Sequence, residues 1–168
     1  MAPYPAPVSL LAGCVGSGAN AEMDMEQQAD QIIGTYGLTT GNRYSSLSEI
    51  EGEFLDDELI RSYYGDPLTQ PDFAQVEAYV VYIDETRPTL PSEFGIFKMK
   101  PDADKELFKA FLQARIDLKL LNAVAYPTMD TQPLETAVVA EEGDYIWYSV
   151  VKDGNSQIND QLKQAMGG

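Results

Sequence analysis

The feature that most constrains the fold is an amphipathic helix predicted from Asp102 to about Leu121. Two adjacent apolar rows run along it: Leu107, Phe111, Ala114, Leu118 and Leu121 form one, and Phe108, Leu112 and Ile116 form the other. So wide an apolar face is typical of a helix that lies across a sheet. We expect the row of Leu107, Phe111 and Leu118 to face that sheet.

Strand signals stand on both sides of this helix. Before it, residues 76–83 and 94–100 are rich in β-branched and aromatic side chains, and Thr86–Pro91 separates them. After it, residues 136–140 and 145–151 flank Glu141-Glu142-Gly143-Asp144, which is a strong hairpin signal. The sequence therefore predicts two pairs of antiparallel strands.

Three further helices are predicted at residues 23–36, at about 54–64, and from Asn155 or Ser156 to the end of the chain. The last would bury Ile158, Leu162, Ala165 and Met166. Residues 38–48 are polar and read as a loop. The resulting order, ααββαββα, favours an α+β fold in which helices pack on one face of an antiparallel sheet of about four strands.

The N-terminal region carries the only cysteine, Cys14, directly after Leu11-Ala12-Gly13. This run resembles the lipobox of bacterial lipoproteins, where the thiol receives a diacylglyceryl group before cleavage in front of the cysteine. Small, flexible residues follow as far as Ala21 and suit a tether. We therefore expect a lipidated Cys14 with its tether at residues 14–21, and a single α+β domain at 22–168.

Residues 1–13 fit a secretory signal only in part. They contain no Lys or Arg, and Pro3, Pro5 and Pro7 interrupt the apolar run. We expect them to be a residual signal segment. The alternative is a leader that carries Leu-Ala-Gly-Cys by chance.

Composition excludes several classes of function. The absence of histidine excludes Ser-His-Asp and Cys-His catalysis, and a single cysteine excludes an intramolecular disulfide. The formal net charge of −16 disfavours a nucleic-acid partner, because phosphate binding needs basic residues. We expect no cofactor, no metal site and a monomer, with a membrane contact only through lipid at Cys14.

The whole pattern, from the lipobox through the strand pairs to the closing helix, resembles one uncharacterised domain-of-unknown-function family. Its members are small lipoproteins of Gram-positive bacteria. The most specific stretches are residues 76–82 and 138–151. The resemblance implies a lipid-anchored location outside the cytoplasmic membrane and carries over no catalytic residue.

Two surfaces are candidates for binding. Tyr79, Tyr82 and Trp147 lie on predicted strands and would form an aromatic platform for a sugar or peptide if helices covered one sheet face only. The alternative is that these rings pack inside the fold. Lys98 and Lys100, near Lys105 and Lys109, would form a basic patch for an anionic partner, or would only compensate Asp102, Asp104 and Glu106.

Carboxylates are the remaining candidates. Six of them lie between Glu49 and Glu58 and would either bind calcium or form the acidic start of a helix. The sequence thus favours a lipid-anchored accessory or binding protein, whose partner is an unknown protein or a cell-envelope polymer. The alternative is a secreted, carboxylate-dependent hydrolase of glycans.

Overall fold

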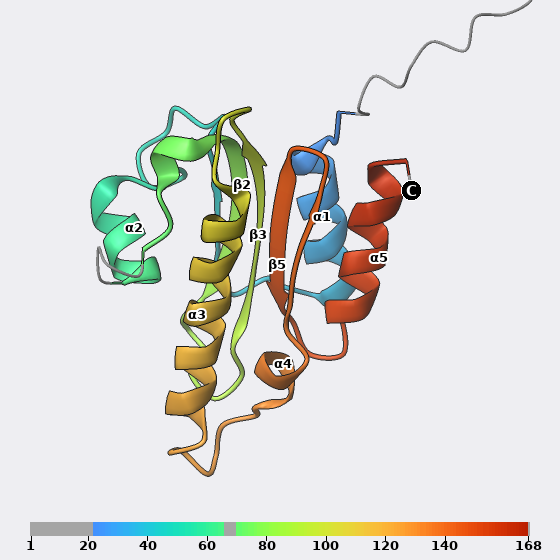
Figure 1. The fold of residues 1–168 in the computed structure, drawn as a ribbon. Helices are drawn as coiled ribbons and strands as arrows, with labels where there is room; N and C mark the ends of the chain where they lie inside the picture. Colours follow the sequence, from blue (N-terminus) through green and yellow to red (C-terminus); the bar gives the residue numbers. More distant parts are fainter. Residues whose placement is uncertain (1–21, 66–69, 168) are drawn as a thin grey trace, which may run out of the picture.

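The computed structural model describes residues 22–65 and 70–167 (Figure 1). They form one five-stranded sheet in the order β1-β2-β3-β5-β4, with every neighbouring pair antiparallel. The strands are β1 (Asn42–Ser45), β2 (Val76–Asp84), β3 (Ser92–Met99), β4 (Val138–Glu142) and β5 (Tyr145–Val150). The predicted α+β class and antiparallel sheet are confirmed, with one strand more than expected.

Helices cover both faces of the sheet. Figure 1 shows α1 (Met25–Tyr36) and α5 (Asn155–Ala165) on one face, and α2 (Asp57–Tyr64) and α3 (Lys105–Ala123) on the other. The short α4 (Gln132–Glu135) follows α3, and a 3₁₀ turn (Phe73–Gln75) precedes β2. The prediction that helices pack on one face only is therefore wrong.

Two hydrophobic cores explain this three-layer arrangement. Alternate side chains of a strand point to opposite faces, and in β2, β3 and β5 both sets are largely apolar. The α1/α5 face buries Ile32, Val80, Tyr82, Phe94, Ile96, Trp147, Ile158 and Leu162. The α2/α3 face buries Val81, Phe97, Phe108, Leu112, Ile116, Ile146 and Tyr148. A sheet with two apolar faces needs a helical layer on each.

Strand β1 was not predicted, and it lies within residues 38–48, which were predicted to be a loop. Its four residues are Asn-Arg-Tyr-Ser, too short and polar to give a strand signal. It forms because it adds an edge to β2 and buries Tyr44 against α2, where the Tyr44 and Tyr63 hydroxyls are 2.5 Å apart.

The orientation of α3 also differs from expectation. Phe108, Leu112 and Ile116 are the buried row, whereas Leu107 is 45% exposed and Leu118 is 58% exposed. The two rows are neighbours on the helix, so apolar periodicity alone does not decide between them. The buried row is the one that also turns Arg115 toward the sheet, where it meets a buried carboxylate of β3.

The difference between the buried and the exposed apolar row of α3 can be tested with one substitution in each row. Leu112→Ala should lower the free energy of unfolding by about 2–5 kcal/mol, because it opens a cavity in the α2/α3 core. Leu118→Ala on the same helix should change it by about 0.5 kcal/mol or less. Urea unfolding followed by the fluorescence of the single tryptophan, Trp147, measures both values. A larger loss for Leu118→Ala than for Leu112→Ala would mean that the assigned face is wrong.

Candidate functional site

The predicted aromatic surface is largely buried. Trp147 and Tyr82 lie beneath α1 and α5, at 0% and 1% exposure. The Trp147 indole Nε1 donates to Asn159 Oδ1 of α5 at 3.2 Å, and the Tyr82 hydroxyl accepts from the backbone N–H of Gly41 at 2.7 Å. These rings join the layers of the fold, and the prediction that they form an exposed binding platform is wrong.

Tyr79 lies on the opposite face of the sheet from these two rings. It packs edge-on against Phe73, with ring centroids 5.9 Å apart, and its hydroxyl accepts from the backbone N–H of Leu55 at 2.8 Å. Burial raises the pKa of Tyr79 above its ordinary value. Tyr79 thus fixes the segment before α2 and shares no surface with Trp147.

The ammonium groups of the predicted lysine patch are bound to carboxylates or to backbone carbonyls of the protein itself. Lys98 Nζ lies 3.0 Å from a Glu22 carboxylate oxygen and 3.1 Å from one of Glu77, and these carboxylates raise the pKa of Lys98. Lys100 Nζ donates to the carbonyl of Ala74 at 2.6 Å. Lys105 pairs with Asp144 at 3.7 Å, and Lys109 pairs with Glu106 at 2.8 Å and with Glu141 at 3.3 Å. Of the three expected acids, Glu106 alone is among these partners, and the patch carries little surplus charge.

The remaining predicted sites are Cys14 and the acidic run between Glu49 and Glu58. Cys14 lies outside the described residues. In the acidic run, Asp56 Oδ1 accepts from the backbone N–H of Leu59 at 2.8 Å and so caps α2. Within residues 22–65 and 70–167, no three Asp, Glu or Cys side chains are arranged to hold a metal ion.

The charged cluster that stands out was not predicted. Glu93 of β3 is 1% exposed and faces α3. Its carboxylate accepts from Arg115 Nε at 3.1 Å, from Arg115 Nη2 at 2.8 Å and from Lys119 Nζ at 2.8 Å. Arg115 and Lys119 stand one helical turn apart on α3, so both reach the same carboxylate.

The electrostatics of this cluster follow from burial and pairing. Burial alone would raise the pKa of Glu93, but Arg115 and Lys119 outweigh it and lower the pKa to about 2. The Arg115 guanidinium also lies 4.8 Å from the centre of the Tyr64 ring, a cation–π contact. Glu93 is therefore ionised at neutral pH, and two cations share its single negative charge.

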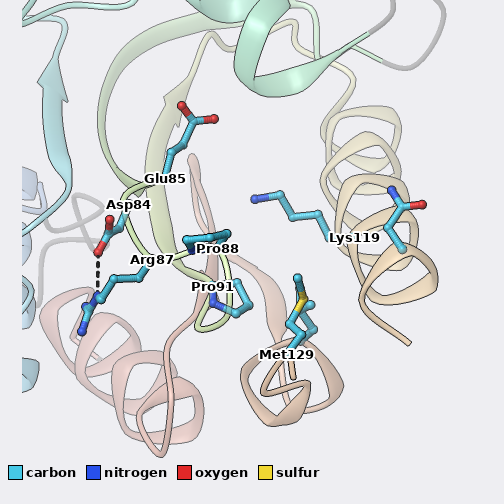
Figure 2. A pocket seen from close by; sticks show the side chains of 9 residues that line it. Asp84, Glu85, Arg87, Pro88, Pro91, Lys119 and Met129 are labelled. Carbon is cyan, nitrogen blue, oxygen red and sulfur yellow. Dashed lines mark hydrogen bonds and ion pairs between the residues drawn. The ribbon is translucent and has the colours of Figure 1, made fainter. Parts of the chain in front are cut away.

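Two hollows meet above this cluster, and both are lined by Lys119 and Asn122. The first, the α2/α3 pocket, has a volume of about 400 Å³ and is lined further by Ser62, Tyr63, Tyr64, Gly65, Ala114, Arg115 and Leu118. The second, the loop pocket, has a volume of about 310 Å³ and is lined further by Asp84, Glu85, Arg87, Pro88, Pro91, Met129 and Leu134. We call the two together the Lys119 groove. Figure 2 shows Lys119 reaching from α3 into the loop pocket.

The two carboxylates of the loop pocket have different environments. Asp84 accepts hydrogen bonds from Thr40 Oγ1 at 2.6 Å, from the backbone N–H and hydroxyl of Thr86 at 2.8 and 2.6 Å, and from Arg87 Nε at 3.1 Å. Burial opposes ionisation of Asp84, but these donors outweigh it and lower the pKa to about 2. Figure 2 shows Asp84 turned toward Arg87 and Glu85 pointing away from both. The pair does not converge on one point, as an acid and a nucleophile of glycoside hydrolysis must.

Sequence reasoning missed the cluster although a signal for it exists. Glu93 is a lone acid inside an apolar strand, and a buried carboxylate requires a cationic partner. Arg115 and Lys119, like Lys105 and Lys109, are basic residues whose spacing of four places them on one face of the next helix. The pairing of strand with helix was needed to join the two observations.

Comparisons with known proteins add no identification. No protein-family model matches the chain, and searches of curated proteins and of solved structures found no significant similarity. In the described part of the chain, no helix combines the length and the apolar character that crossing a membrane requires.

The Glu93 cluster makes stability depend on pH in a defined direction. The pKa of Glu93 is about 2 in the folded protein and about 4.3 when unfolded, so its contribution is complete above pH 5 and disappears as the pH falls toward 2. Glu93→Gln should cost about 3–5 kcal/mol at pH 7, because it leaves buried Arg115 without its charge partner. The difference from wild type should shrink at low pH.

Urea unfolding at several pH values between 7 and 2.5 measures this difference. Glu106→Gln is the matched control, since it removes an exposed partner of Lys109 and should cost less than about 1 kcal/mol. Parallel pH curves for wild type and Glu93→Gln would contradict the assigned role of the cluster.

Proposed function

We propose that this chain is a binding protein held by lipid at Cys14 on the outer face of a bacterial cytoplasmic membrane. In this proposal the Lys119 groove is the surface that contacts its ligand or partner. The ligand is part of an unknown protein, part of a cell-envelope polymer, or a free small molecule.

The groove is the observation that carries the proposal. Ligand sites are concave, mostly apolar, and contain a few placed polar groups within roughly 300–1,000 Å³. The α2/α3 pocket, at about 400 Å³, combines the apolar side chains of Ala114 and Leu118 with the charged ends of Arg115 and Lys119. Trp147 and Tyr82 of the aromatic platform are buried, and Lys98 of the lysine patch is paired with Glu22 and Glu77.

The N-terminal sequence supports the lipid anchor. Leu11-Ala12-Gly13-Cys14 provides a lipobox, and the following small residues provide a tether. A net charge of −16 repels an anionic membrane surface, so attachment at that surface requires a lipid. Asp84 and Glu85 of the loop pocket point apart and so do not support the alternative of a glycan hydrolase.

Lipid labelling tests the anchor directly. The full chain is expressed behind a lipoprotein signal in a Gram-positive host fed with labelled palmitate. The wild-type protein should incorporate label and sediment with membranes until detergent is added. Cys14→Ala should incorporate none, because the thiol is the acceptor of the lipid, whereas the tether variant Ser17→Ala should behave like wild type.

Equal absence of label from wild type and Cys14→Ala, with both proteins in the soluble fraction, would refute the lipid-anchored part of the proposal.

A further inference from the structure

The described lining of the α2/α3 pocket has more positive charge than Glu93 beneath it neutralises, and this surplus points to the chemistry of a ligand. The inference rests on the proposed function, because it takes the groove to be the binding surface. On the α2/α3 side, Arg115 and Lys119 carry two positive charges, and Glu93 beneath them carries one negative charge. Arg115 is 11% exposed and donates two hydrogen bonds to Glu93, so the surplus charge lies at Lys119, whose side chain is 35% exposed and open to a ligand.

Among the residues that the structure describes, Glu93 is the one carboxylate that forms an ion pair with Lys119. In the loop pocket, Asp84 is paired with Arg87 at 3.1 Å. Glu85 forms no ion pair with Lys119 within 4.0 Å. The described lining residues at the C-terminal end of α2 are Ser62, Tyr63, Tyr64 and the capping Gly65, none of which is acidic. In a chain of net charge −16, the described lining of the α2/α3 pocket is a local positive site.

The cluster also has hydrogen-bond donors to spare. An ammonium group has three N–H donors, and Lys119 uses one on Glu93 at 2.8 Å. The side-chain amide of Asn122 lines the same pocket one turn further along α3. An incoming carboxylate has two oxygens, each of which accepts such donors.

The rest of the pocket is suited to an apolar group. Leu118 is 58% exposed and lines the pocket beside Ala114, opposite the C-terminal end of α2. Removing such a side chain from water is favourable in proportion to the apolar area that the ligand covers. A ligand with a charged end and an apolar body would thus cover both kinds of lining.

We infer that the α2/α3 pocket binds a small carboxylic acid with an apolar or aromatic body. The carboxylate accepts from Lys119 Nζ and the Asn122 amide, and the body lies against Leu118 and Ala114. Such a group has two sources, a free acid or the C-terminal carboxylate of a peptide.

Isothermal titration calorimetry on the full chain carrying Cys14→Ala tests this inference. The probes are 3-phenylpropionate as a free acid, N-acetyl-Ala-Phe as a peptide C-terminus, and the amide of each. Both acids should bind at least tenfold more tightly than their amides, because only the acids neutralise the surplus charge. A tenfold preference for one acid over the other identifies the source, and equal binding supports the shared chemistry.

Variants locate the contact. Lys119→Met keeps the apolar stem and the Glu93–Arg115 pair but removes the surplus charge, and it should weaken both acids at least tenfold. Lys109→Met is the matched control: it removes the same charge from the same helix outside the groove, where Lys109 pairs with Glu106 and Glu141, and should leave affinity unchanged. The fluorescence of Trp147 checks that every variant is folded.

Three results would overturn the inference. Equal binding of acid and amide would show that the carboxylate is not recognised, although the groove would still be a binding site. Unchanged affinity in Lys119→Met would place the acid elsewhere. If no acid binds at about 10 mM, a Kd tighter than millimolar is excluded and the carboxylate chemistry falls. The palmitate labelling of Cys14 is independent of all three, so failure of the anchor is recognised separately.

Discussion

The carboxylate of Glu93 is the constraint on which the arrangement of this molecule depends. A charge buried on the central strand of a sheet must be paired, and its cationic partners stand on the helix that covers it. The bonds from Arg115 and Lys119 therefore fix both the rotation and the position of α3 along the sheet. That rotation buries the row of Leu112 and leaves Leu118 at the surface, where it becomes a wall of the groove.

The two apolar faces of the central strands determine what is left for function. Because α1 and α5 cover one face and α2 and α3 cover the other, the aromatic side chains of the strands pack inside the fold. Gly95 illustrates how closely the layers are fitted, since a Cβ on it would lie 2.7 Å from the Tyr148 ring. The functional candidate consequently lies at the edge of a layer, where α2 and the β2–β3 loop leave space beside α3.

Much of the fold was predictable because its signals are local. Periodicity located α1, α3 and α5, and the Gly143 turn, with its φ of +57°, located the β4–β5 hairpin. Short elements such as β1 and α4 were not predicted, since they are stabilised by contacts distant in sequence. The groove was missed for the same reason: Tyr64, Glu93 and Lys119 come from three separate elements, and only the tertiary fold makes them neighbours. The usable signals were the lone acid in β3 and the spacing of Arg115 and Lys119 on α3.

The central claim is that the cluster beneath α3 holds one more cation than Glu93 neutralises, and that a carboxylate from outside completes it. A crystal structure of the chain grown with 3-phenylpropionate tests this most directly. The account predicts the carboxylate of the acid within about 3 Å of Lys119 Nζ, with its ring against Leu118 and the Glu93–Arg115 pair unchanged. A structure in which a carboxylate of the chain itself occupies that position, with the added acid elsewhere or absent, would contradict it.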